Sequence, residues 1–365
     1  MDHRYRERDG AVQDFDEPVF AQLTENHRYE LQVHCYRMLG SFDDSEDLVQ
    51  ETFLRAWNKR DTFEGRSSAR AWLYRIATNA CLDFLAHHSR KPQSHSIEGR
   101  AAGAGQAPPH LSWLQPYPDR LLSLAAPSNA EPDAAAVAKE TIELAFLVAI
   151  QHLPPRQRAV LILRDVLGYP AGDIADVLDV SVPAVNSALQ RARLTLKKHL
   201  PPRREEWRPT EDPTVAERRL LQRYMQVMEW SDADAIAEAM TELVAEDVRV
   251  TMPPHPIWFV GRESFIGGMR VSLDPESPGY VGEWRCVPTR ANTQLAVAQY
   301  LRAPGDDAFR AQVVNVLRLQ AGMIAEITAF GDGIFPALGL PAVLDEQNTA
   351  PAYSSEPIVA GRTDG

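Results

Sequence analysis

In one stretch in the middle of the chain, every charged residue is basic. It runs from Val185 to Arg204 and holds six cations and no acid. These are Arg191, Arg193, Lys197, Lys198, Arg203 and Arg204. Lysine and arginine side chains bind phosphate oxygens, and a guanidinium group also matches the two acceptors on the edge of guanine. The spacing therefore predicts a surface that contacts nucleic acid.

Other residues are candidates for acid–base chemistry, but their spacing argues against catalysis. Asp47 and Glu51 lie one helical turn apart beside Arg55, which predicts a solvated face and not an apolar pocket that shifts a carboxyl pKa. His255 lies in the proline-rich loop 252–256, where a structural role is expected over that of a general base. The chain has three cysteines, none at metal-ligand spacing. We expect no catalytic residue, no metal and no cofactor.

The net charge of −12 taken alone argues against a nucleic-acid partner. However, residues 209–365 hold 22 acidic and 12 basic residues, whereas residues 139–208 hold 8 acidic and 11 basic ones. The acidic last third is therefore expected to hold the basic segment off DNA by charge. No apolar run approaches the ~18 residues of a membrane helix, and no signal peptide pattern is present, so we expect a cytoplasmic protein.

Composition divides the chain into segments. Prolines and glycines gather between 93 and 138, which predicts a linker with little regular structure. The other boundaries predict domains at 15–92, 139–204 and 214–335, followed by a disordered tail at 345–365.

The basic stretch is predicted to lie on the second helix of a helix-turn-helix. Apolar residues step by three and four along 182–200 and predict one buried stripe. Its members are Val182, Val185, Leu189, Ala192 and Leu196. A short helix at 171–179 precedes it across a tight turn, and helices are also expected at 139–151 and 156–166.

The first domain is predicted to be helical and the last to combine helices with a sheet. Caps at 43–45 and at Ser67 begin two long helices of the first domain. In the last domain the expected helices lie at 214–228, 232–243 and 262–273. Strands are expected at 248–252, 258–260, 282–290, 294–302, 310–319 and 324–330. Alternating apolar residues favour a curved antiparallel sheet with one buried face.

Two groups of motifs resemble one family. Asp43–Trp57 (DDSEDLVQETFLRAW) and Arg70–Asp83 (RAWLYRIATNACLD) resemble the polymerase-binding region 2 of bacterial sigma-70 type factors of the extracytoplasmic-function (ECF) group. Leu153–Val160 (LPPRQRAV), with the helix-turn-helix after it, resembles region 4 of that family. The resemblance implies two all-α sigma domains and a protein that binds core RNA polymerase and directs it to specific promoters.

The resemblance also implies roles for individual residues. Contacts to core polymerase are implied for Asp47, Gln50, Glu51 and Arg55. Binding of the −10 element, with a base held outside the stack, is implied for Phe63, Glu64, Gly65, Ser67, Arg70, Arg75 and Asn79. Binding of the −35 element is implied for Pro183, Ala184, Asn186, Ser187, Gln190, Arg191, Arg193 and Lys197. For Trp72, base contact and core packing stay open.

Residues 214–335 are similar to the SnoaL-like domain, a cone-shaped α+β fold carried by a subset of these factors. The similarity rests on Trp258–Arg262 (WFVGR), Phe330–Gly333 (FGDG) and the linker motif Trp113–Pro118 (WLQPYP). Such folds act as enzymes or as binding modules, and we expect a regulatory domain that docks on the sigma domains and holds a small ligand. The side chains expected to line its cavity are Asp247, His255, Trp230, Trp258, Trp284 and Tyr300.

Two other classes of protein are rivals to this interpretation. One is a SnoaL-type isomerase or hydrolase fused to a DNA-binding module, and the other is a one-component repressor. Neither needs the polymerase-binding segment Asp43–Trp57. An anti-sigma partner stays undetermined at this stage, and no membrane partner is expected.

Overall fold

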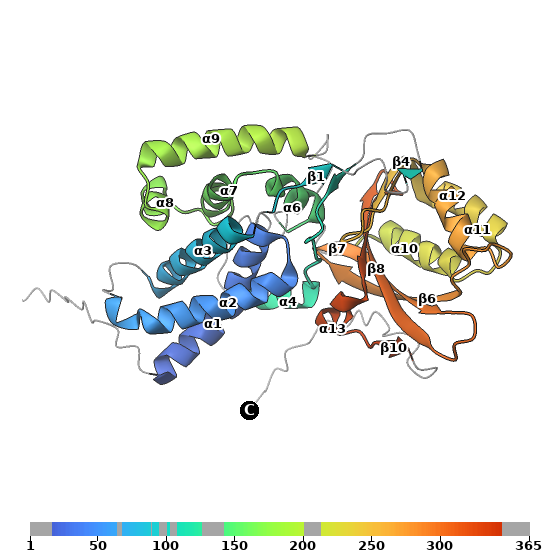
Figure 1. Ribbon diagram of the computed structural model, residues 1–365, viewed down its shortest axis with the longest axis horizontal. Coiled ribbons are helices and arrows are strands. Elements are labelled where there is room, and N and C mark those ends of the chain that lie inside the picture. The colour runs from blue at the N-terminus through green and yellow to red at the C-terminus, as the bar shows by residue number, and fades with distance from the viewer. Residues whose placement is uncertain are drawn as a thin grey trace, which may run out of the picture.

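The computed structural model describes residues 17–63, 68–88, 90–94, 101–102, 108–125, 142–200 and 213–344. These residues form a helical lobe from the first half of the chain and a lobe of sheet and helices from the second half (Figure 1). The expected combination of two all-α sigma domains with a C-terminal α+β domain is confirmed. The segment 345–365 lies outside the described residues.

Three long helices make the first domain: α1 (Glu17–Leu39), α2 (Phe42–Asn58) and α3 (Ala69–His87). A short 3-10 turn, Arg60–Thr62, follows α2. The expected caps were displaced by a few residues. The hydroxyl of Ser41 caps α2 by accepting from the Asp44 amide, and that of Ser68 caps α3 by accepting from the Ala71 amide. Any serine near a helix start can cap it, so sequence alone did not select among neighbours.

The second domain contains α6 (Leu144–Gln151), α7 (Pro155–Leu161), a π-helical turn at Ile162–Val166, α8 (Ala171–Leu178) and α9 (Val182–His199). Asp179 closes α8 with a left-handed φ of 51° and sets the tight turn into α9. The expected stripe on α9 is buried except at its first member, Val182, which is 41% exposed. The helix expected from residue 139 begins at Leu144.

The segment between these domains packs against its surroundings where it is described. Strands β1 (Gln93–Ser94) and β3 (Pro109–His110) pair with each other, and α4 (Asp119–Ala125) follows them. Leu111, Leu114 and Tyr117 are 3%, 5% and 0% exposed. Because these side chains are buried in the core shared by both lobes, this part of the chain is not the loosely structured linker that its prolines and glycines predicted.

The C-terminal lobe begins with α10 (Val215–Met228), whose first turn is held by a capping box between Thr214 and Glu217. Then come α11 (Ala233–Leu243), β4 (Val244–Thr251), β5 (Trp258–Val260) and α12 (Arg262–Leu273). The remaining strands are β6 (Glu283–Ala291), β7 (Gln294–Arg302), β8 (Phe309–Gln320) and β9 (Met323–Gly331). A 3-10 turn (Asp332–Ile334), α13 (Phe335–Leu338) and β10 (Val343–Leu344) end the lobe.

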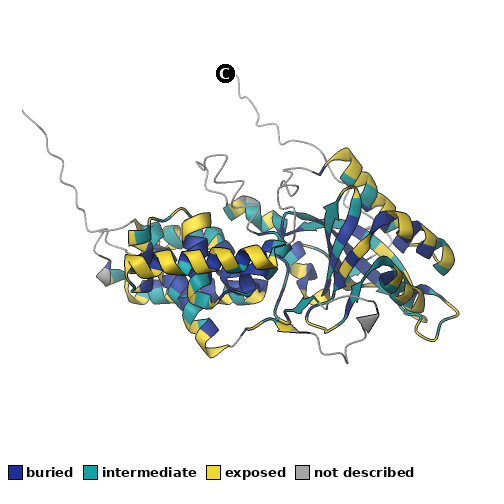
Figure 2. Ribbon diagram, turned by 90° about the horizontal axis from the view of Figure 1, so that it is seen from above, coloured by how far each residue is buried: buried dark blue, intermediate teal, exposed yellow. Residues whose placement is uncertain are grey.

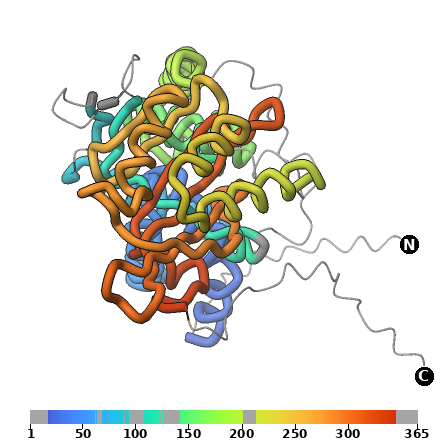
Figure 3. The backbone as a smooth tube through the Cα atoms, turned by 90° about the vertical axis from the view of Figure 1, so that its right-hand side faces the viewer, coloured from blue at the N-terminus to red at the C-terminus, as the bar shows by residue number. Residues whose placement is uncertain are grey.

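The strands form one mixed sheet in the order β2-β5-β4-β9-β8-β7-β6, in which β2 is the short strand Ala101–Ala102 from the connecting segment. The expected antiparallel pairing holds from β6 to β9, but β4 lies parallel to β9. Helices α10 to α12 cover the inner face of the sheet, and Figure 3 looks onto this lobe.

The two faces of the sheet belong to two different cores. Alternate residues of β7 divide between them: Leu295 and Val297 pack toward α10 to α12, whereas Ala296, Ala298 and Tyr300 join the core of the helical lobe. The outer face over β6 to β8 is therefore buried against the sigma domains, and the two lobes share one apolar core.

Candidate functional site

Helix α9 presents the predicted −35 residues to solvent. Val185, Leu189, Ala192 and Leu196 face the core of the domain and hold the helix in place. The opposite side carries Pro183, Ala184, Asn186, Ser187, Gln190 and Arg191, all of which are exposed. Figure 2 shows this exposed side running along the whole helix. A face of small and polar side chains ending in cations has the form that fits a major groove.

The cations of α9 differ in what they contact. The Arg193 guanidinium is held by Asp165, with Nη2 2.6 Å from Oδ1 and Nε 2.9 Å from Oδ2. This hydrogen bonding raises the pKa of Arg193. Arg191 and Lys197 are exposed, and neither has a side-chain hydrogen bond or ion pair among the described residues. Arg191, unlike Arg193, can therefore turn to a base edge without first breaking an ion pair.

The surface of α2 carries the predicted polymerase-binding residues. Asp47 and Gln50 are exposed, while Glu51 and Arg55 are half-buried. The Arg55 guanidinium bridges Glu51 Oε1 at 2.6 Å and Asp83 Oδ2 of α3 at 2.7 Å. The side chains therefore form an ordered polar face across two helices.

One apolar residue on this face was missed by the sequence analysis. Leu54 is 65% exposed and lies one turn from Gln50 and two turns from Asp47. The sequence could have indicated this residue, because it places a leucine on a helix face that is otherwise polar. A large exposed apolar side chain among polar ones is typical of an interface centre.

Two of the three predicted −10 residues on α3, Arg70 and Asn79, are engaged within the molecule. Arg70 donates from Nε to Glu30 Oε2 at 2.9 Å and from Nη2 to the same oxygen at 2.7 Å. Burial by itself would raise the pKa of Glu30, but hydrogen bonds from His27 and Arg70 outweigh it and lower that pKa. Glu30 is thus ionised and holds the guanidinium on the protein.

The second domain covers the same side of α3. Asn79 Nδ2 donates to the backbone oxygen of Val177 in α8 at 3.3 Å, and the Tyr74 ring lies 6.1 Å from that of Tyr169. Arg75 remains exposed. The two predicted promoter-reading units are therefore in direct contact.

Two residues near the start of α3 pack together. Phe63 is buried, and its ring lies 5.2 Å from that of Trp72, which is half-buried. Core packing is thus what Trp72 does in this structure. Glu64, Gly65 and Ser67 lie outside the described residues.

A tight turn of the C-terminal domain reaches the junction of the other units. Asn292 is the first residue of the β6–β7 turn and has a φ of 57°. Its Nδ2 donates to the Tyr36 hydroxyl of α1 at 2.8 Å and to the Ile142 oxygen at 2.7 Å. Its Oδ1 accepts from the Tyr117 amide at 2.9 Å, and its own amide donates to the Tyr117 oxygen at 2.9 Å. One buried side chain thus binds three separate parts of the chain.

Neighbouring residues extend this contact. Asp119 accepts from the Thr293 amide at 2.8 Å and from Arg290 Nε at 3.1 Å. The Leu144 amide, at the start of α6, donates to Gln294 Oε1 at 3.1 Å. Because these polar groups are partly buried, losing one partner leaves the other poorly paired and incompletely hydrated.

The cavity expected inside the C-terminal domain does not form from the side chains assigned to it. Tyr300 lies on the outer face of the sheet, where its hydroxyl donates to the Pro341 oxygen at 3.0 Å. Trp284 packs on the inner face, and Asp247 and His255 are exposed. The expectation was wrong for Trp284 and Tyr300 because the pleat of the sheet sends them to opposite sides. His255 lies in the loop after β4 and lines a cavity outside this domain's interior.

The inner face is filled mainly by apolar side chains, together with a small polar cluster. Asn315 Nδ2 donates to the Tyr224 hydroxyl at 3.2 Å and to Gln299 Oε1 at 2.9 Å. Burial raises the pKa of Cys286 to about 12 and raises that of Tyr224 as well, so both side chains stay protonated. The cluster supplies neither a base nor a nucleophile at neutral pH.

The fold and these surfaces define a protein with two helical regions for polymerase and promoter binding and an appended α+β domain. Known families match each part: Sigma-70 region 2 at residues 23–91, Sigma-70 region 4 at 143–196 and the SnoaL-like domain at 221–327.

Known proteins agree with this division. The chain is 39% identical over 327 residues to the ECF RNA polymerase sigma factor SigG of Mycobacterium tuberculosis, covering 88% of this chain and 84% of that one. It is 28% identical over 200 residues to SigW of Bacillus subtilis, covering 55% of this chain and 98% of SigW. The crystal structure of the M. tuberculosis ECF sigma factor SigJ superposes with a TM-score of 0.53 at 21% identity, covering 88% of this chain and 99% of that one, and shares the fold.

The chain therefore belongs to the ECF RNA polymerase sigma factors, with a SnoaL-like domain at its C-terminal side. Members of this family bind core RNA polymerase and promoter DNA and are not enzymes. In the described residues, no helix is long and apolar enough to span a membrane. No group of three or more His, Cys, Asp or Glu side chains in that part of the chain is arranged to hold a metal ion.

Proposed function

We propose that this sigma factor has a closed form, in which region 4 packs on the promoter-reading side of region 2, and that the SnoaL-like domain holds it closed. The support is the contact between Asn79 and Val177, which joins the two regions. The −10 and −35 elements lie about 25 base pairs apart, which is about 85 Å of B-form DNA. Two units in direct contact cannot reach both elements at once, so initiation requires them to separate.

The residue roles follow from the surfaces described above. Residues 15–92 act as region 2, 139–204 as region 4 and 214–335 as the regulatory domain. Asp47, Gln50, Glu51 and Arg55 bind core polymerase, and Leu54 supplies the apolar centre of that contact. Arg70, Arg75 and Asn79 act with the segment from Phe63 to Ser67 on the −10 element. The −35 element is read by the exposed face of α9, where Arg191 recognises a base and Arg193 and Lys197 bind phosphates.

The observation that carries the regulatory role is the turn at Asn292. Its side chain binds region 2 through Tyr36, the connecting segment through Tyr117 and the start of region 4 through Ile142. A domain that contacts all three units in one arrangement stabilises that arrangement over any other. Docking, and not catalysis, is thus the role we assign to it, in a cytoplasmic protein.

The variant Asn292→Gly tests this role. Glycine adopts the left-handed backbone of the turn without strain, so the change removes only the side-chain hydrogen bonds. Losing buried hydrogen bonds costs about 1–3 kcal/mol, which predicts a roughly 5- to 150-fold shift toward the open form. Run-off transcription with limiting amounts of the variant and saturating core polymerase should rise severalfold, and a chain truncated after Pro209 should behave similarly.

Thr293→Gly is the matched control. Thr293 has a φ of 61° in the same turn, and its hydroxyl donates only to the neighbouring Asn292 oxygen. This variant should transcribe like the unmodified protein. Equal transcription by Asn292→Gly, Thr293→Gly and the unmodified chain would contradict the proposed role of the docked domain.

A further inference from the structure

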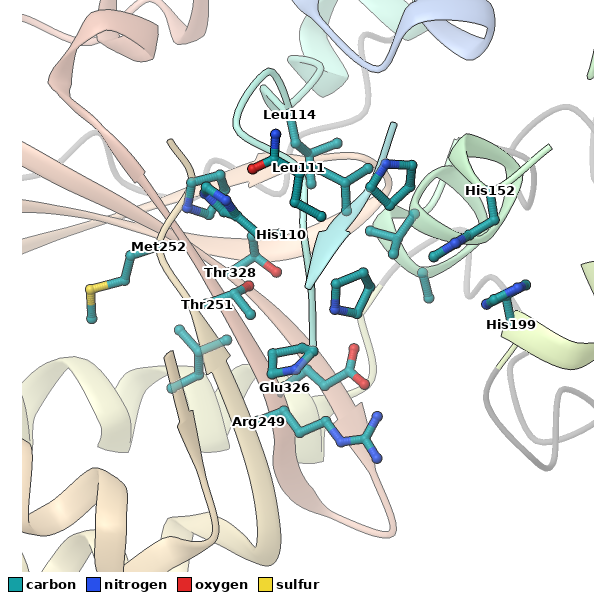
Figure 4. Close-up of a pocket in the computed structure, with 18 of the residues that line it drawn as sticks. His110, Leu111, Leu114, His152, His199, Arg249, Thr251, Met252, Glu326 and Thr328 are labelled. Carbon is teal, nitrogen blue, oxygen red and sulfur yellow. The ribbon is translucent and has the colours of Figure 1, made fainter. Parts of the chain in front are cut away.

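A cavity of about 470 Å³ lies where the three units of the closed form meet. Its walls come from α6 and α9 of region 4, from the connecting segment around β3, and from strands β4 and β9 of the SnoaL-like domain (Figure 4). It is on the outer face of the sheet, away from the interior enclosed by α10 to α12. The volume falls within the range of small-molecule sites, roughly 300–1,000 Å³.

The outer face of the sheet changes character at this cavity. Over β6 to β8 it is apolar and packs into the core of the helical lobe. Over β4 and β9 it carries Arg249, Thr251, Glu326 and Thr328, which line the cavity. A docking face made only for packing has no use for four polar side chains on adjacent strands, so this part of the face is suited to a polar ligand.

Among the charged residues that line the cavity, cations outnumber anions. Arg249 is exposed and has no side-chain hydrogen bond or ion pair among the described residues. Glu326 is already bound by Arg318, with Nη2 2.9 Å from Oε1. On the opposite wall the rings of His152 and His199 stack at 3.8 Å beside Lys198. Two lining cations thus face a single carboxylate that has its own partner.

The remaining walls are mostly apolar, with Gln93, His110 and His255 as their polar members. Leu111, Leu114 and Val148 line the side of region 4 and the connecting segment, and Met252 lines the side of the sheet. A ligand that fits both kinds of wall carries an anionic group and a compact apolar body. We infer that this cavity is a binding site for a small organic anion, with Arg249 as the residue that binds the anionic group.

The site has a regulatory consequence that rests on the proposed closed form. Because its walls belong to three units, the site exists only when those units are docked. A ligand that binds one of two states stabilises that state by an amount set by its concentration relative to its Kd. An organic anion in this cavity therefore keeps the sigma factor closed and lowers transcription.

Fluorescence titration of the full chain with 8-anilinonaphthalene-1-sulfonate tests the site, because this probe joins an anionic group to an apolar body. N-phenyl-1-naphthylamine, which lacks the sulfonate, controls for apolar binding. The variant Arg249→Glu should bind the sulfonate about tenfold more weakly or worse, with the affinity for the uncharged analogue unchanged. The control Arg219→Ala, which removes an exposed arginine of α10 outside the cavity, should bind both probes as the unmodified chain does.

Two outcomes would overturn the inference: the same sulfonate affinity in Arg249→Glu and the unmodified chain, or an equal loss for the two probes. Neither depends on polymerase, so they are distinct from a failure of the proposed function. The proposed function fails if Asn292→Gly leaves transcription unchanged. If the sulfonate still binds through Arg249 in that case, the cavity is an anion-binding site without the regulatory effect.

Discussion

The two helices predicted to bind promoter DNA differ in exposure within one structure. On α9 the predicted −35 face is exposed from Pro183 to Arg191. On α3 two of the three predicted −10 side chains are engaged, because Glu30 holds Arg70 and Asn79 donates to Val177 of region 4. The predicted polymerase-binding face of α2 is also accessible, with Asp47, Gln50 and Leu54 exposed. The proposed closed form therefore restrains promoter melting and the spacing of the two units. It leaves the predicted contacts with polymerase and with the −35 element accessible.

The exposure of α9 also changes the role expected for the acidic segment 209–365. Its charge predicted electrostatic shielding of the basic helix, but Pro183, Gln190 and Arg191 on the predicted −35 face of α9 are exposed. The domains are joined by a shared apolar core and by enclosed hydrogen bonds at Asn292. Contacts of this kind depend little on ionic strength.

The largest expected effect is at the open polymerase-binding face. Leu54→Asp places a charge at the centre of the proposed contact and should weaken binding to core polymerase by about 100-fold, a loss typical of an interface hot spot. The affinity of the labelled sigma factor for core polymerase is the measurement. Leu124→Asp is the control, because Leu124 is 56% exposed on α4, away from that face. Equal affinities of the two variants would remove Leu54 from the interface.

The next effect is at the open face of α9. Arg191→Ala should lower the preference for the native −35 sequence by roughly 5- to 150-fold, which is the value of one bidentate base contact. Templates selected by the unmodified holoenzyme can be compared with the same templates mutated at −35. Arg164→Ala removes an exposed arginine bound to the Tyr169 oxygen and should keep full preference. Undiminished selectivity in Arg191→Ala would reassign base recognition to another residue of α9.

The smallest effect is at the covered face of α3. Glu30→Gln should cost about 1 kcal/mol or less of stability at pH 7, because Arg70 is partly exposed. The pKa of Glu30 is lowered in the folded chain, so its contribution is present above the unfolded pKa near 4.5 and is lost as pH falls through the folded value. Urea unfolding at pH 7 and pH 4 should therefore show a smaller difference between Glu30→Gln and the unmodified chain at the lower pH. A difference that grows on acidification would contradict this ion pair.

Elements defined by local patterns could be predicted from the sequence. The helix 262–273 and the strands 258–260 and 294–302 have the predicted bounds, since each is a clear run between turn residues. The exposed face of α9 could be predicted from its apolar stripe, because the stripe is buried and the opposite side of the helix then faces solvent. Val182 departs from that stripe because it lies in the first turn, where the helix extends beyond the domain core.

Long-range contacts could not be predicted. Asn292 and Tyr36 lie 256 residues apart, and nothing near either position indicates the other. The sequence shows Asn292 only as a turn residue and Tyr117 only as part of a proline-rich segment. The contact between Asn79 and α8 could not be predicted either. The family motifs describe each region alone and do not indicate how the regions pack together.

Energy transfer between regions 2 and 4 tests the closed form most directly. Dyes at Ala86→Cys on α3 and Asp176→Cys on α8, both exposed positions, report the separation of the two regions in a Cys286→Ser background. Transfer should be high in the free chain, because α3 and α8 are in contact. It should fall to a low value on the promoter-bound holoenzyme, where the elements lie about 85 Å apart. High transfer retained in the promoter complex, or low transfer already in the free chain, would contradict the proposal.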